Sequence, residues 1–254
     1  MMENKTSEII AKARQYEEQL PPVPSFTPLD RPLATYLDCA LHDPDSTPEM
    51  VEQFCREARE NQIATVFINP IYVPLTKRLL DGSGVHVGTV AGFPLGGFPT
   101  RIKLEEARFY LSEGADEIDM VLNVGMLKSG EYEFILDEIS QMAEAVHQQG
   151  GLLKVILEMV LLTRFEKIAA CLLAKEGQAD FVKTSTGFSK GGATAEDVDL
   201  MRRVVGPPGE MGVKGAGGIR SLETALAMID AGADRLGTRL ATQILQEYQA
   251  KYDN

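Results

Sequence analysis

Eight short apolar runs divide the chain, and amphipathic stretches lie between most of them. The runs are continuous rather than alternating, which is typical of parallel strands that are buried on both faces. The intervening stretches, such as residues 47–62 and 103–114, have helical period. Eight such units predict an α/β protein with a single (β/α)8 barrel, a TIM barrel, over residues 33–246. The runs are residues 34–41, 64–70, 85–93, 116–124, 152–160, 179–186, 211–217 and 234–238.

A short motif recurs where a helical stretch ends and an apolar run begins. Gly114-Ala115-Asp116, Gly177-Gln178-Ala179-Asp180 and Gly232-Ala233-Asp234 all lie at such a junction. Glycine suits the position after a helix, and the small residue allows a tight turn into a strand. The alternative, an open doubly wound sheet, would carry a GxGxxG motif after its first strand, and the sequence has none there. The pattern therefore favours the closed barrel.

The two ends of the chain lie outside this pattern. Residues 4–19 have helical period, and the proline-rich stretch 21–32 that follows breaks any helix. We therefore expect three parts in the 254 residues: a helical extension with its linker (1–32), the barrel (33–246) and a C-terminal tail (247–254). The N-terminal helix is expected to cover the barrel bottom or to make a dimer contact.

Two tyrosines lie four residues apart near the C-terminus. Tyr248 and Tyr252 are expected to pack on a frayed last helix. The less favoured alternative is that one of them reaches over the barrel mouth as a proton donor.

Charge and composition exclude several classes of function. The 25 basic and 37 acidic residues give a net charge of −12, which disfavours a nucleic-acid partner but leaves room for a local phosphate site. No stretch approaches the roughly 18 apolar residues of a membrane span, and the N-terminus lacks a secretory apolar core. The three cysteines are widely spaced, so we expect reduced thiols, a cytoplasmic location and no metal site.

Three lysines lie inside successive apolar runs. Lys183 and Lys214 are 31 residues apart, about one strand–helix unit, so they are expected on neighbouring strands. Two ammonium groups that close together cannot both stay charged cheaply. One amine becomes neutral and nucleophilic, as Schiff-base formation requires. Lys154, on the preceding run, is expected to be a supporting charge.

Acidic residues also lie within the runs. Asp119 is flanked by Ile118 and Met120 and is a candidate for proton transfer, or for balancing the lysine charges. Asp38 and Glu158 are similar acids that we expect to support the site.

Glycines follow the later strands, where barrels often bind phosphate. Gly217 and Gly218 lie between a run and a helix, so backbone N–H groups there can approach an anion. Gly237 follows the last run, and Thr184 and Gly187 add a hydroxyl and a further glycine after Lys183.

Together these residues resemble the deoxyribose-phosphate aldolase family of metal-free class I aldolases. The resemblance spans about residues 36–238, and the motif ADFVKTSTGFSKGGAT (179–194) is its most specific part. It also rests on GTVAGFPLG (88–96), EGADEIDMVLNVGMLKSGEY (113–132), VKGAGGIR (213–220) and the tripeptide INP (68–70).

The resemblance implies a function as well as a fold. It implies reversible cleavage of 2-deoxy-D-ribose 5-phosphate to acetaldehyde and D-glyceraldehyde 3-phosphate, with no cofactor. By motif match, Lys183 would form the Schiff base, Lys214 would lower its pKa and Asp119 would shuttle protons through water. Small aldehydes and sugar phosphates would be the partners of a homo-oligomer, either a dimer or a tetramer. The implied phosphate-binding residues are Gly187, Gly217, Gly218 and Gly237.

The sequence departs from the family pattern around the phosphate loop and the first strand. Arg239 and Leu240 stand where the family usually has two serines, and Arg239 could supply a bidentate anion contact. Ala40 and its neighbours replace a His, Thr and Lys near Asp38. One alternative is therefore an aldolase for a non-phosphorylated aldehyde acceptor. A less favoured alternative is a non-catalytic barrel that binds a phosphorylated metabolite.

Overall fold

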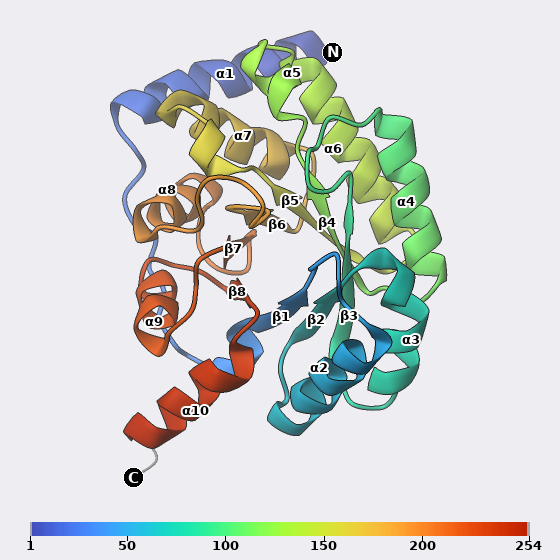
Figure 1. Ribbon diagram of the computed structural model, residues 1–254. Coiled ribbons are helices and arrows are strands. Elements are labelled where there is room, and N and C mark those ends of the chain that lie inside the picture. The colour runs from blue at the N-terminus through green and yellow to red at the C-terminus, as the bar shows by residue number, and fades with distance from the viewer. Residues whose placement is uncertain (1, 253–254) are drawn as a thin grey trace.

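The computed structural model of the protein describes residues 2–252, and these form a closed barrel of eight parallel strands surrounded by helices (Figure 1). Each strand pairs with its neighbours in sequence, and the first pairs with the last through Asp38 and Gly237. This confirms the predicted TIM barrel and rules out the open sheet. The strands are β1 (Leu37–Leu41), β2 (Thr65–Ile68), β3 (His86–Ala91), β4 (Glu117–Val121), β5 (Leu152–Ile156), β6 (Phe181–Lys183), β7 (Gly212–Ala216) and β8 (Arg235–Thr238).

The helices form the outer layer, and their apolar faces cover the strands (Figure 1). Strands β2 and β4 are buried at every position, as continuous apolar runs predict. The outer helices are α2 (Pro48–Asn61), α3 (Val73–Leu80), α4 (Thr100–Ser112), α5 (Val124–Lys128), α6 (Tyr132–His147), α7 (Arg164–Glu176), α8 (Ala195–Val205), α9 (Leu222–Asp230) and α10 (Ala241–Tyr252).

The recurring Gly-Ala-Asp motif joins neighbouring strands at the N-terminal end of the barrel. The carboxylates of Asp116, Asp180 and Asp234 each accept a 2.8 Å hydrogen bond from a backbone N–H of the preceding strand. The aspartate that ends each motif therefore helps to fix the register of β3 with β4, β5 with β6, and β7 with β8.

The N-terminal helix α1 (Met2–Glu18) packs along α7 and α6 on the outside of the barrel (Figure 1). Its buried side chains include Ile9 and Ala13, which are four residues apart and so lie on one face of the helix. The helix does not cover the barrel bottom. The linker reaches that end instead, where the Arg31 guanidinium donates a 2.7 Å hydrogen bond to the carbonyl oxygen of Asp234.

The C-terminal boundary expected at residue 246 falls inside α10, which continues to Tyr252. The rings of Tyr248 and Tyr252 lie 4.8 Å apart on this helix, and Tyr248 also packs against the core. Residues 253–254 of the expected tail lie outside the described part of the chain. Neither tyrosine lines the barrel pocket described below.

Candidate active site

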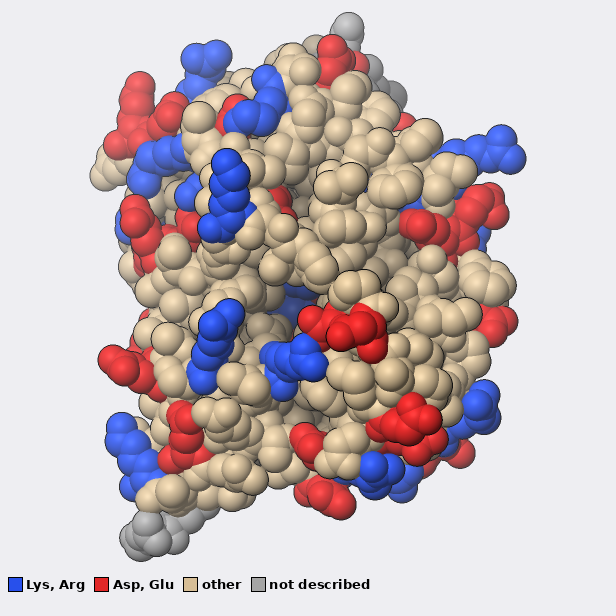
Figure 2. All heavy atoms as spheres, viewed as in Figure 1, with Lys and Arg blue, Asp and Glu red and all other residues tan. Residues whose placement is uncertain are grey.

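A pocket of about 580 Å³ opens at the C-terminal ends of the barrel strands. Lys183 and Lys214 line it, together with loops that follow β1, β6, β7 and β8. Figure 2 shows a hollow in this face with basic side chains at its floor and both basic and acidic side chains beside it. The pocket occupies the place where barrel enzymes hold their active sites.

Lys183 and Lys214 lie side by side, because β6 and β7 pair them directly in register. Both ammonium groups contact the same carboxylate oxygen: Lys183 Nζ is 2.7 Å and Lys214 Nζ is 3.0 Å from Asp119 Oδ2. The structure thus brings together the three residues that the sequence proposes for catalysis.

The environment favours the neutral amine at Lys183. Burial disfavours its charged form, and the neighbouring charges of Lys214 and Lys154 add to this, while Asp119 opposes it. The result is a pKa of Lys183 lowered to about 8. Asp119 behaves in the opposite way: burial acts to raise its pKa, but the three lysines hold that pKa below its usual range. Asp119 is therefore ionised.

Asp38 and Lys154, two of the three residues expected to support the site, contact the catalytic candidates from within the barrel. Lys214 Nζ lies 2.6 Å from Asp38 Oδ2, and Lys154 Nζ lies 3.3 Å from Asp119 Oδ1. Lys154 also forms an ion pair with Glu117, and Arg235 Nη1 lies 2.5 Å from Asp38 Oδ1.

Two of these residues are absent from the sequence-based prediction. Glu117 and Arg235 each precede a predicted site residue, Asp119 or Gly237, by two positions. Since every second residue of a strand faces the same side, this spacing is the signal that could have identified them.

The aromatic ring of Phe67 packs against the buried lysines. Lys214 Nζ lies 3.6 Å and Lys154 Nζ lies 4.4 Å from its ring centroid, which are cation–π distances. Opposite the ring is Gly88, where a Cβ would lie 2.5 Å from the ring carbons. The glycine makes room for Phe67, a residue that the apolar run 64–70 does not distinguish from core.

The predicted phosphate glycines line the pocket, but Thr184 does not. Gly217 and Gly218 have φ values of +87° and +79°, a left-handed backbone that favours glycine. Thr184 Oγ1 instead lies 3.1 Å from the carbonyl oxygen and 3.0 Å from the amide nitrogen of Ala216, within the barrel wall. The structure thus places the Thr184 hydroxyl on the backbone of β7, which differs from the expected position in the pocket. The glycines that line the pocket are Gly187, Gly217, Gly218 and Gly237.

Glu158 also lies outside the barrel pocket, but it holds one of the pocket loops. Its Oε2 accepts hydrogen bonds from the backbone N–H (3.1 Å) and hydroxyl (2.6 Å) of Thr186. Thr186 lines the pocket and is followed by Gly187. Glu158 thus fixes the position of the loop that carries Gly187.

Arg239 lies on the rim of the pocket, where it forms an ion pair with Asp43. Its side chain is 49% exposed, so a bound anion can reach it. His42 also lines the pocket, near Phe67 and Phe93, and is absent from the residues predicted for the site. Burial and the nearby Lys183 charge lower the pKa of His42 to about 3, so this ring is neutral.

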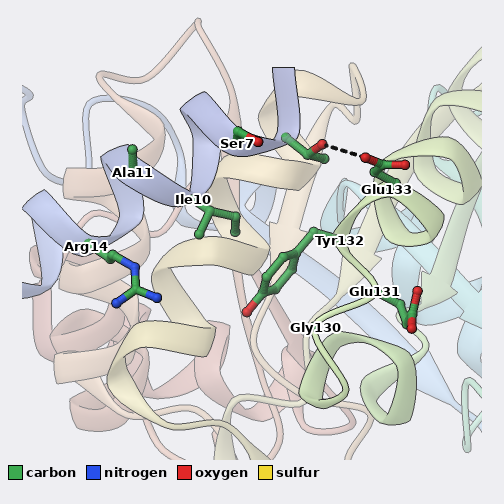
Figure 3. Close-up of a pocket in the computed structure, with 9 residues that line it drawn as sticks. Ser7, Ile10, Ala11, Arg14, Gly130, Glu131, Tyr132 and Glu133 are labelled. Atoms are coloured by element: carbon green, nitrogen blue, oxygen red, sulfur yellow. Dashed lines mark hydrogen bonds between the residues drawn. The ribbon is translucent and has the colours of Figure 1, made fainter. Parts of the chain in front are cut away.

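A second pocket lies away from the strand ends, between α1 and residues 130–133 at the start of α6 (Figure 3). Ile10, Arg14 and Tyr132 line it, and Thr6 Oγ1 lies 3.4 Å from Glu133 Oε1 at its edge. It contains none of the buried lysines. Within the described residues, no group of His, Cys, Asp and Glu could hold a metal ion, and no helix is long and apolar enough to cross a membrane.

Comparison with known proteins identifies the family. Residues 33–244 match the profile described as "DeoC/LacD family aldolase". The chain belongs to this aldolase family. The protein of Thermotoga petrophila named deoxyribose-phosphate aldolase is 47% identical over 252 residues, 99% of this chain and 99% of its own length. The family match covers the barrel and all twelve predicted site residues, which lie between residues 38 and 239.

Solved structures of the aldolase family have the same fold. A protein from Coccidioides immitis superimposes with a TM-score of 0.90 at 34% identity, covering 98% of this chain and 100% of that one. The deoxyribose phosphate aldolase of Aeropyrum pernix, described as tetrameric, has a TM-score of 0.80 at 33% identity and covers 88% of this chain and 95% of its own.

Proposed function

We propose that this aldolase cleaves 2-deoxy-D-ribose 5-phosphate reversibly to acetaldehyde and D-glyceraldehyde 3-phosphate, through a Schiff base on Lys183. The observation that carries the proposal is one geometry: a buried lysine beside a second lysine, with both amines on one carboxylate oxygen. The names of full-length relatives support the same substrate.

In this mechanism the Lys183 amine attacks the C1 aldehyde, and loss of water leaves an iminium. The C3 hydroxyl then gives up its proton and the C2–C3 bond breaks. The electrons of that bond enter the iminium and form a neutral enamine in place of a carbanion. Protonation of the enamine and hydrolysis release acetaldehyde and restore the amine. Asp119, ionised between the lysines, accepts and returns these protons through water.

The same pocket offers a place for the phosphate. Gly217, Gly218 and Arg239 line it together with Lys183 and Lys214. The backbone N–H groups of a glycine turn and a guanidinium are both groups that bind phosphate. Binding energy at this remote group would hold the reacting carbons in place.

A second candidate function keeps the lysine chemistry and changes the acceptor to a non-phosphorylated aldehyde. Leu240 and Phe188 favour it, because both are apolar and line the pocket near the proposed phosphate site. A comparison of kcat/KM for 2-deoxyribose with and without its 5-phosphate separates the two candidates.

Borohydride trapping tests the Schiff base itself. Incubation with acetaldehyde and sodium borohydride is expected to leave a reduced ethyl adduct on Lys183, found by peptide mass spectrometry. Omission of acetaldehyde is the control. A chain that carries no adduct at Lys183 would rule out both aldolase functions.

Replacement of Arg239 tests the phosphate site. For Arg239→Gln we expect kcat/KM on 2-deoxyribose 5-phosphate to fall about 10- to 100-fold, the effect of losing one charge-assisted hydrogen bond. The unphosphorylated sugar should be cleaved at the unchanged rate. Arg56→Gln, an exposed arginine on α2, is the matched control. Equal losses on both sugars would mean that Arg239 acts only through its ion pair with Asp43.

We further propose that the chain forms a homo-oligomer, a dimer or a tetramer, and works in the cytoplasm. The tetramer of the Aeropyrum pernix relative supports the first proposal. Cys39, Cys55 and Cys171 are buried and unpaired, which fits a reducing compartment. Light scattering on the purified protein measures the oligomeric state directly.

A further inference from the structure

The lysines of the pocket belong to a larger group of buried charges that fills the barrel interior. We refer to this group as the core charge cluster. It contains three carboxylates and four basic side chains: Asp38, Glu117 and Asp119 with Lys154, Lys183, Lys214 and Arg235. If every member were ionised, the cluster would carry a net charge of +1. A buried net charge is costly, so the cluster is expected to release one proton more readily than an isolated lysine does.

The contacts indicate which basic group gives up that proton. Lys214 contacts two carboxylates, Asp38 at 2.6 Å and Asp119 at 3.0 Å. Lys154 also contacts two, Glu117 and Asp119. Lys183 contacts only Asp119, which it shares with both other lysines. The least compensated ammonium is thus the one proposed to be the nucleophile.

Arg235 is the member of the cluster that cannot release a proton, because a guanidinium stays charged at any ordinary pH. It lies at the start of β8 and does not line the pocket. Its Nη1 is 2.5 Å from Asp38 Oδ1 and 2.9 Å from Thr65 Oγ1, and its Nη2 is 3.6 Å from Glu117 Oε1. Arg235 therefore shares Asp38 with Lys214 and Glu117 with Lys154, which weakens the hold of both carboxylates on the lysine protons.

We propose that Arg235 is a positioning residue that makes the free-amine form of Lys183 easier to reach, by adding a permanent positive charge beneath the lysines. This inference rests on the proposed function, because it takes Lys183 as the nucleophile. It assigns a role in the reaction to a side chain that does not touch the substrate.

The predicted effect on pH dependence has a definite sign. Loss of a positive charge from the cluster stabilises the Lys183 ammonium, so the pKa of Lys183 rises. The acidic limb of the pH–activity profile then moves to higher pH.

Other titratable groups also surround the cluster. His86 on β3 shares a 3.1 Å hydrogen bond with Glu117, and this bond raises the pKa of His86. The titratable and charged groups around Lys183 are Asp38 and His42 on or after β1, His86 on β3, Glu117 and Asp119 on β4, Lys154 on β5, Lys214 on β7 and Arg235 on β8.

The test measures kcat/KM for cleavage of 2-deoxyribose 5-phosphate against pH from 6 to 10. For Arg235→Gln we expect the acidic limb to move up by about one pH unit, so activity at pH 7 falls about tenfold and returns at high pH. Arg235→Lys keeps the charge, so the midpoint of its acidic limb should stay near that of the wild-type protein. Arg235→Met is a second neutral variant, for use if the Gln chain does not fold.

A double variant checks the charge count. Asp38→Asn combined with Arg235→Gln removes one charge of each sign, so the midpoint should return toward wild type. Arg202→Gln is the matched control, since Arg202 is a buried arginine that pairs with Asp234 outside the cluster. It should lower stability without moving the midpoint.

The outcomes separate this inference from the proposed function. If neutral substitution of Arg235 lowers activity by the same factor at every pH, or leaves the midpoint in place, the inference is wrong. If the wild-type chain forms no borohydride adduct at Lys183, the proposed function fails instead. An adduct at Lys183 together with an unmoved midpoint overturns only the role of Arg235.

Discussion

Substitution of Lys183 by methionine is expected to lower kcat/KM for 2-deoxyribose 5-phosphate by at least about 10⁴-fold and to abolish borohydride trapping. Methionine fills a similar volume without an amine, so the barrel should stay folded. Lys214 is not expected to replace it, because its ammonium is held by two carboxylates, Asp38 and Asp119. Turnover is measured by the release of acetaldehyde, and the adduct by mass spectrometry.

Lys190→Met provides the control for this experiment. Lys190 is exposed on the loop that follows β6, seven residues beyond Lys183, and should be dispensable for turnover. Circular dichroism and thermal unfolding show whether each variant is folded. An active Lys183→Met chain, or one whose adduct forms on another lysine, would contradict the assignment of the nucleophile.

The order and type of the barrel strands could be predicted from the sequence because each strand is a continuous apolar run. The ends of the strands could not. The run 152–160 predicts a longer strand than β5, but Glu158 adopts a φ of +55° and a short 3-10 turn follows it. Similarly, β6 ends at Lys183 within the run 179–186. These stops depend on tertiary contacts, such as the hydrogen bonds of Glu158 to Thr186, that periodicity does not contain.

The candidate site was predicted in part for a related reason. Lys183, Lys214 and Asp119 are charged residues inside apolar runs, and such residues are conspicuous in a sequence. Phe67 and His42 are not, because an aromatic ring in or after an apolar run resembles ordinary core. Which side of the barrel wall a residue faces depends on register, and a shift of one position reverses it. Thr184 illustrates this: it follows Lys183 directly, yet its hydroxyl bonds to β7 rather than facing the substrate pocket.

Asp119→Asn tests proton transfer separately from the nucleophile, and we expect it to lower kcat at the pH optimum about 10²- to 10⁴-fold. The carboxylate of Asp119 helps to keep Lys183 protonated, so its removal lowers the pKa of Lys183 further and increases the free amine at pH 7. The acidic limb should therefore move to lower pH while the maximal rate falls. A loss of the nucleophile could not produce both effects.

Asp116→Asn is the matched control, because Asp116 lies just before the same strand but contacts Lys77 and the backbone N–H of Val87 instead of the pocket. This variant should unfold more easily and still cleave the substrate at a similar kcat. Pre-steady-state trapping with borohydride adds a direct measurement, since slower loss of water from the carbinolamine delays the adduct in Asp119→Asn. If that variant kept more than about a tenth of wild-type kcat at its own optimum, the proton would have to move through another group of the pocket. His42 is then the group to test, because it is neutral at physiological pH and lines the same cavity as Lys183.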